Sequence, residues 1–322
     1  VLPILANLEG QAKLKDRYIA VLVLVPTREL ALQVNDVFET FSKALPFTCK
    51  IMAVFGGTSV NVQMKSMSNV SVLIATPGRL LDLISSNAVH LDEVKTFVID
   101  EADKMLNLGF KKELDEIIAL LPTKKQNLLF SATLNPNIES IKRVMLTDPL
   151  TIHIASEENS VALINQTAYA VSPEKKGPLL RHLIESQNMQ QVLIFTSSVF
   201  QADAVSKKLN HNNIQAKAIH SNKSQFARTT ALANFKEGKL RVLVATDILS
   251  RGIDIKFLPY VINYELPRSP KDYIHRIGRT GRSENPGEAI ALVTPADQHH
   301  FEVIQKKMGF AVEMIDARLL NF

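Results

Sequence analysis

Short runs of apolar, often β-branched residues recur along the chain without alternating with polar residues. Eight of these runs are VLVLVP from Val21, VSVLIATP from Val70, TFVI from Thr96, NLLFSAT from Asn127, VLIFTSS from Val192, RVLVATD from Arg241, YVINYELP from Tyr260 and AIALVTP from Ala289. Continuous hydrophobicity over so few residues is typical of strands that are buried on both faces, as in parallel sheets. Helical patterns such as RELALQVNDVFETFSKAL and KKELDEIIALL lie between the runs. The order of strands and helices predicts an α/β fold, with mainly parallel sheets covered by helices on both faces.

The length of the chain predicts two such domains. With 322 residues, 46% of them hydrophobic, the chain is long enough for two separate cores. The polar stretch at residues 156–163, around SEENS, is predicted to be a linker between a first domain at 1–155 and a second at 164–322. The two domains contain weakly similar segments, VLIATPGRLLD at Val72 and VLVATDILSRGID at Val242, in each of which an apolar run reaches Ala-Thr. This similarity indicates weakly that the domains are related.

Composition and charge narrow the class of protein. The single cysteine, Cys49, cannot form an internal disulfide, and no Cys/His cluster has the spacing of a zinc site, so a reducing cytoplasm is the expected location. No apolar run approaches the roughly 18 residues that span a bilayer, so we expect a soluble protein without a membrane partner. The net charge is +5, and the whole excess lies after residue 155, with 21 Lys and Arg against 16 Asp and Glu. This bias is compatible with a nucleic-acid partner and does not establish one.

Three carboxylates follow the strand TFVI within four residues: Asp100, Glu101 and Asp103. The carboxyl ends of parallel strands form the ligand crevice of open α/β sheets, so chemistry is expected there. Hydrolysis of a nucleoside triphosphate needs Mg²⁺ to offset phosphate charge and a carboxylate to activate water, and adjacent acids suit both tasks. The alternative is a solvated helix start, where acids complement the helix dipole.

The segment RIGRTGR, residues 276–282, places three arginines and two glycines within seven residues. Glycine costs about 1 kcal/mol relative to alanine inside a helix, so an ordinary helix does not explain this composition. Guanidinium forks suit a phosphate whose charge grows in a transition state. A basic surface loop is the alternative.

These motifs occur in the order and rough spacing of a known family. They are PTRELALQ (26–33), the pair Gly56 and Gly57, TPGRLLD (76–82), DEAD (100–103), SAT (131–133), IFTSS (194–198), ATDILSRGIDI (245–255) and YIHRIGRTGR (273–282). From about residue 20 to 295 the chain resembles the DEAD-box ATP-dependent RNA helicases. The segments HSNKSQFAR, ANFKEGKLRVLVATD and NYELPRSPKDYIHRIGRTGR are most similar to the bacterial RhlE-type branch.

The resemblance implies two RecA-like domains that close on ATP and single-stranded RNA. It implies that Asp100 and Glu101 bind Mg²⁺ through water and activate the hydrolytic water, and that Asp103, Ser131, Thr133 and His275 couple the nucleotide state to domain closure. It also implies that Arg279 and Arg282 are arginine fingers. Gly252 and Asp254 match the nucleotide contact of the second domain, with Asp254 on the ribose.

For RNA, the resemblance implies contacts to the sugar-phosphate backbone. The matching residues are Pro26, Thr27, Arg28, Gly57, Thr76, Arg79, Arg228 and Thr246. Small residues let backbone N–H groups approach phosphates while arginines supply charge, so binding should be largely independent of sequence. The alternative is local chemistry: Thr27 could cap a helix, and Pro77 with Gly78 could make a turn.

One departure from the family concerns the phosphates of ATP. A loop of the G-x-x-x-x-G-K-[ST] kind is expected just before the first motif, and neither it nor the upstream glutamine segment occurs in the 322 residues. We expect the chain to begin just after that loop, because VLPIL resembles the helix that normally follows it, and we predict negligible ATPase activity for this fragment. A smaller departure is Ser221, where the family usually has glycine.

The sequence therefore predicts a non-processive RNA helicase or RNA-remodelling ATPase. Two alternatives stay open: a non-catalytic RNA clamp, and a DNA-directed motor of the wider helicase superfamily.

Overall fold

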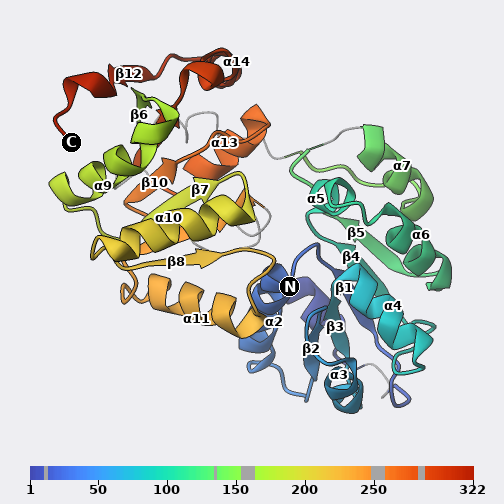
Figure 1. The fold of residues 1–322 in the computed structure, drawn as a ribbon. Helices are drawn as coiled ribbons and strands as arrows, with labels where there is room; N and C mark the ends of the chain where they lie inside the picture. Colours follow the sequence, from blue (N-terminus) through green and yellow to red (C-terminus); the bar gives the residue numbers. More distant parts are fainter. Residues whose placement is uncertain (11–13, 134–135, 154–163, 248–257, 282–286) are drawn as a thin grey trace. The chain divides into compact units, whose positions relative to one another are not determined.

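The structure is a computed structural model that describes residues 1–10, 14–133, 136–153, 164–247, 258–281 and 287–322 (Figure 1). The chain divides into two compact units, Val1–His153 and Ile154–Phe322, which we call unit 1 and unit 2. The predicted linker at 156–163 lies outside the described residues, and the domain limits at 155 and 164 stay predictions.

Unit 1 contains a parallel sheet of five described strands in the order β2-β3-β1-β4-β5. The strands are β1 (Val21–Leu24), β2 (Ile51–Val54), β3 (Val72–Ala75), β4 (Thr96–Ile99) and β5 (Gln126–Leu129). Every residue of β1, β3 and β4 is buried, which matches the continuous apolar runs from which these strands were predicted. The edge strands β2 and β5 are more exposed.

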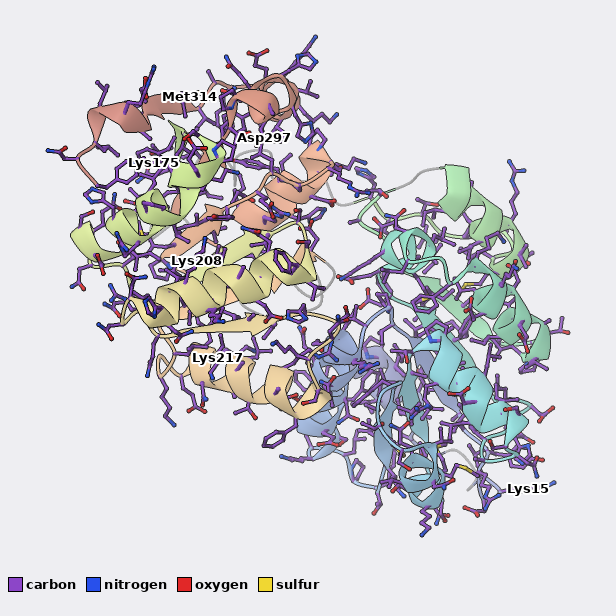
Figure 2. The ribbon with its side chains drawn as sticks, viewed as in Figure 1. Lys15, Lys175, Lys208, Lys217, Asp297 and Met314 are labelled. Carbon is purple, nitrogen blue, oxygen red and sulfur yellow. The ribbon has the colours of Figure 1, made fainter. Side chains whose placement is uncertain are left out.

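Helices cover both faces of this sheet. They are α1 (Leu2–Ala6), α2 (Arg28–Ser42), α3 (Val60–Ser66), α4 (Pro77–Ser85), α5 (Ala102–Asn107), α6 (Lys111–Leu120) and α7 (Pro136–Met145). Successive strand residues point to opposite faces, so Val21 and Leu22 belong to different cores. Leu22 packs in one core with residues of α4 to α7, and Val21 packs in the other with residues of α1 and α2. Figure 2 shows side chains filling the layers between sheet and helices.

Unit 2 contains a parallel sheet of seven described strands in the order β12-β6-β11-β10-β7-β9-β8. The strands are β6 (Asn165–Ala170), β7 (Val192–Thr196), β8 (Ala216–Ile219), β9 (Val242–Thr246), β10 (Tyr260–Asn263), β11 (Glu288–Val293) and β12 (Glu313–Asp316). All pairings in both sheets are parallel within the described residues.

Unit 2 is also covered on both faces. Its helices are α9 (Lys176–Ser186), α10 (Val199–His211), α11 (Gln225–Lys236), α13 (Pro270–Ile277) and α14 (Gln298–Met308), with short 3₁₀ turns at Pro173–Lys175, Pro295–Asp297 and Ala317–Leu319. Residues of α9 and α10 pack in one core, whereas those of α11 and of α13 with α14 pack in two clusters on the other face. The predicted α/β class, with mainly parallel sheets between helices, is confirmed.

Across the described residues, no helix is both long and apolar enough to cross a membrane. In each unit the parallel strands bring their following loops to one edge of the sheet, and most of the predicted site residues fall in these loops or just after them.

Candidate functional site

The first of the three acids, Asp100, directly follows β4 at the carboxyl edge of the unit 1 sheet. Its backbone N–H donates to the carbonyl of Leu24 (3.0 Å), and its Oδ1 accepts from the N–H of Glu101 (2.9 Å). Burial raises the pKa of Asp100, and the hydrogen bond from Glu101 opposes that rise. A carboxylate whose charge is disfavoured by burial is stabilised by a nearby cation, so Asp100 fits a metal-binding role.

Glu101 adopts a backbone conformation that is rare for a residue with a side chain. Its φ and ψ are both +50°, in the left-handed region, where it precedes the first residue of α5. Such strain is of order 1 kcal/mol or more and is concentrated at functional sites. Its Oε2 pairs with Nζ of Lys104 at 2.8 Å, and the Lys104 side chain is only 7% exposed. The acids do begin a helix, as the alternative reading proposed, but helix capping does not explain the strain at Glu101.

The third acid, Asp103, is joined to the loop after β5. Thr133 Oγ1 donates to Asp103 Oδ2 at 3.0 Å. Ser131 Oγ donates to the carbonyl of Thr133 at 2.7 Å, and the N–H of Ala102 donates to the carbonyl of Phe130 at 3.0 Å. The fold therefore brings together Asp103, Ser131 and Thr133, which are separated by up to 30 residues in the sequence.

A second group of predicted residues lies after β1 and β2. Thr27 caps α2, since its side chain accepts from the N–H of Leu30, so the capping interpretation is correct for this residue. Arg28, the first residue of α2, lies against the Gly56-Gly57 turn. Gly57 has a φ of +83°, and a side chain at this position would collide with the Arg28 guanidinium. Glycine is therefore favoured by the backbone conformation, and a side chain here would displace the Arg28 guanidinium.

Arg79 has an internal role. Its side chain is 6% exposed, and it donates to the carbonyl of Thr58 (2.9 Å), to Oε1 of Gln63 (2.9 Å) and to Oδ2 of Asp82 (3.2 Å). The guanidinium thus braces the segment that follows the glycine pair. Thr76 precedes α4, whose first residues are Pro77 and Gly78. The alternative of a simple turn at Pro77 and Gly78 therefore does not hold, because proline at the first helical position leads into a helix.

In unit 2 the predicted residues lie on or beside three elements. Thr246 ends β9, Arg228 lies in the first turn of α11, and both are buried. His275 is exposed on α13, and Arg279 lies half-buried just after that helix. Arg279 is held through its backbone, since its N–H donates to the Arg276 carbonyl and its carbonyl accepts from Leu258.

Three predicted site residues, Gly252, Asp254 and Arg282, lie outside the described residues. The other site residues are grouped within each unit as stated above. Sequence reasoning did not assign Lys104 or Arg276, both of which the structure buries among site residues. A lysine directly after an acidic motif and an arginine beside a predicted histidine were the available signals.

Among the described residues, no three or more His, Cys, Asp or Glu side chains form a cluster that could hold a metal ion. A metal at Asp100 and Glu101 would therefore take most of its ligands from water and phosphate oxygens, as Mg²⁺ commonly does.

Comparison with known families agrees with these two units. The DEAD/DEAH box helicase family matches residues 1–141, and the helicase conserved C-terminal domain matches residues 175–284. Two curated relatives are the ATP-dependent RNA helicase CshA of Listeria monocytogenes, 36% identical over 91% of this chain, and the DEAD-box ATP-dependent RNA helicase RhpA of Helicobacter pylori, 37% identical over 99%. The chain spans 56% and 64% of their respective lengths.

Two solved structures are also similar to this chain over more than nine tenths of its length. Dbp5 of S. cerevisiae, bound to RNA and ADP BeF3, has a TM-score of 0.79 and 28% identity, covering 94% of this chain and 80% of that one. A DEAD box protein from Methanococcus jannaschii is 34% identical and covers 92% of this chain and 80% of that one, with a TM-score of 0.50. Two RecA-like units that carry these motifs define the class of helicase-fold proteins. Within it, the chain belongs to the DEAD-box helicase family; the RhlE-type assignment stays a prediction.

Proposed function

We propose that this protein acts as an ATP-dependent RNA helicase that remodels RNA duplexes and RNA-protein complexes locally. The observation that carries the proposal is the arrangement at the carboxyl edge of unit 1. There the half-buried Asp100 and the strained Glu101 lie beside an Asp103 that is hydrogen-bonded to Thr133. Relatives named as ATP-dependent RNA helicases support the same activity.

The acids have separate roles in this proposal. Asp100 and Glu101 would hold Mg²⁺ through water. Burial raises the pKa of Asp100, so its charged form would be stabilised by a nearby cation. Bound Mg²⁺ with ATP supplies positive charge that offsets the charge developing on the phosphates. Glu101 orients the attacking water and accepts its proton, and Lys104 fixes the direction of the Glu101 carboxylate.

The second unit contributes arginines and a histidine to the same nucleotide. We propose that Arg279 and Arg282 stabilise the charge on the terminal phosphate, and that Gly252 and Asp254 contact the nucleoside. His275, with Asp103, Ser131 and Thr133, transmits the nucleotide state to the closure of the two units.

The proposed RNA contacts lie at helix starts in unit 1. Thr27 and Thr76 precede α2 and α4, whose first backbone N–H groups have no partner within the helix and attract phosphate. Arg28 adds charge beside Gly57, while Arg79 acts from inside by bracing residues 58–63. In unit 2, Arg228 and Thr246 extend the proposed contact. Because these contacts address the backbone, binding should be independent of base sequence and weakened by salt.

A non-catalytic RNA clamp is the second candidate function. A cytoplasmic location is proposed from the single cysteine, which gives no disulfide framework.

The test compares ATP hydrolysis by this chain and by a longer protein that also carries the phosphate-binding loop predicted upstream of Val1. We expect the longer protein to hydrolyse ATP only when single-stranded RNA is added, and this chain to show no turnover with or without RNA. RNA binding without hydrolysis in the longer protein would favour the clamp. Equal stimulation by single-stranded DNA would favour a DNA-directed motor.

Glu101→Gln tests the role of the acid in the longer protein. The amide keeps the side-chain shape and can no longer accept the proton, so turnover should be abolished while ATP-dependent RNA binding persists. The matched control is Glu113→Gln in the first turn of α6, outside the site, which should leave both properties unchanged. Unchanged turnover in Glu101→Gln would contradict the assignment.

A further inference from the structure

The arginine-rich segment begins with a side chain that is buried and hydrogen-bonded within unit 2. Arg276 lies on α13 between His275 and Arg279, and it is 2% exposed. Arginine stays charged in proteins, and a buried charge is tolerated only when its donors are matched by acceptors. The groups that accept hydrogen bonds from the buried guanidinium therefore indicate its role.

Arg276 forms a two-bonded pair with Asp247 and two further hydrogen bonds. Nε and Nη2 donate to the two carboxylate oxygens of Asp247 at 2.6 and 2.8 Å. Nη1 donates to Oδ1 of Asn263 at 2.8 Å and to the carbonyl of Glu265 at 2.7 Å. The guanidinium carbon lies 5.0 Å from the centre of the Phe195 ring.

These partners come from the ends of three neighbouring strands. Asp247 follows β9, Asn263 ends β10, and Phe195 lies in β7 between them in the sheet. Glu265 extends the connection, because its Oε2 accepts from both the N–H and the Oγ of Ser197 at 2.7 Å. We call Ser197, Asp247, Asn263, Glu265 and Arg276 the Arg276 frame.

Three proposed site residues of unit 2 lie next to residues of the Arg276 frame in the chain or one helical turn away. Thr246, a proposed RNA contact, precedes Asp247. His275 and Arg279, proposed nucleotide-side residues, lie next to Arg276 and one turn after it. The N–H of Arg279 donates to the Arg276 carbonyl at 3.1 Å. If Asp247 moves, we therefore expect Arg276 and the carboxyl end of α13 to move with it.

We propose that Arg276 is a positioning residue that links RNA binding at the end of β9 to the placement of His275 and Arg279. This inference rests on the proposed function and adds a coupling residue to it. The fork geometry is what makes the link stiff, because four directed bonds join α13 to Asp247, Asn263 and Glu265, and a lysine could not reproduce them. If the frame only stabilised unit 2, a substitution in it would reduce RNA binding, ATP binding and turnover to an extent that follows the loss of stability.

The experiment uses Arg276→Lys and Asp247→Asn in the longer protein, singly and together. The matched control is Arg241→Lys. Arg241 also donates to buried carbonyls, those of Met189 (2.8 Å) and Ile184 (3.0 Å), but it lies at the opposite, amino end of β9. Asp247→Asn keeps the shape of the frame and removes its charge, so it serves if Arg276→Lys does not fold.

Two readouts separate coupling from stability. The first is the ratio of RNA-stimulated to unstimulated ATP turnover, with KM for RNA and KM for ATP measured separately. We expect Arg276→Lys to lower this ratio by roughly 10-fold or more, within the range typical of coupling between two sites. KM for ATP should change little. The double variant should lose no more than the stronger single variant, because both break one pair. Arg241→Lys should leave the ratio unchanged at a comparable loss of thermal stability.

The second readout does not depend on the proposed function. Amide hydrogen exchange of the RNA-free, nucleotide-free protein should become faster in Arg276→Lys at Ser197, Asp247 and Arg279 together, and not at the amino ends of the strands. Exchange confined to α13, or an equal loss of RNA stimulation in Arg241→Lys, would overturn the proposal. If the unaltered protein shows no RNA stimulation, the proposed function fails, and the exchange result still decides whether the frame joins the two segments.

Discussion

The hydrogen bond between Thr133 and Asp103 allows a direct test of how the acidic motif is tied to the rest of unit 1. Thr133→Val replaces the hydroxyl with a methyl group of similar size and leaves Asp103 Oδ2 without its donor at 3.0 Å. Hydrogen bonds to charged groups contribute about 1.5–3 kcal/mol to stability. Both side chains are half-buried, so water can partly replace the hydroxyl, and we expect a loss of about 1.5 kcal/mol, at the low end of that range.

Hydrogen exchange under increasing urea measures this loss, because peptides from residues 96–133 report the unfolding free energy of unit 1 separately from that of unit 2. Asp103→Asn and the double variant complete the cycle, and the two losses should fall short of additivity by about 1 kcal/mol, as expected for groups in contact. Thr40→Val is the control: the Thr40 hydroxyl donates only to the Asp36 carbonyl on the exposed side of α2, so the change should stay within about 0.5 kcal/mol. Additive losses from the Thr133 and Asp103 variants would refute the reasoning.

Three further changes test the same site. Gly57→Ala should destabilise unit 1 by about 1 kcal/mol, because φ is +83°, and should weaken RNA binding, because the added Cβ displaces the Arg28 guanidinium; normal stability in urea unfolding would contradict this. Arg79→Lys should lower unfolding free energy by about 1–3 kcal/mol, since two bonds to Thr58 and Gln63 are lost. Asp100→Asn in metal-free buffer should raise stability at neutral pH. Burial raises the pKa of Asp100 in the folded state above the unfolded value of 3.8, so the folded state binds more protons than the unfolded state. Stability of the unaltered protein therefore falls as the pH rises from 3.8 through the folded pKa. Unfolding measured as a function of pH should show that the variant's gain in stability disappears below about pH 3.8.

Much of the fold could be predicted because its signals are local. The fully buried strands β1, β3 and β4 read as unbroken apolar runs, and these patterns survive whatever surrounds them. The order β2-β3-β1-β4-β5 could not be read from the same runs, because each strand pairs with residues far away in the chain. The capping role of Thr27 was predictable, since it depends on three adjacent residues. The alternative of a turn at Pro77 and Gly78 could not be decided from the sequence, because proline and glycine are common both in turns and at helix starts.

The sequence by itself determined the class of the protein and predicted the residues that carry its chemistry, because both depend on motifs whose members are close together. It placed Asp100 and Glu101 after a buried strand and the three arginines in one segment. Only the tertiary structure decided which contacts each of them makes and how far each is buried. The link between Asp103 and Thr133 spans 30 residues, and the strain at Glu101 is a property of its backbone conformation. Arg276 and Arg279 read alike in sequence, yet contacts with residues at the ends of β7, β9 and β10 bury Arg276, whereas Arg279 is partly exposed. Burial decides between a charge that holds the protein together and a charge that can meet a ligand, and burial is set by contacts between distant segments.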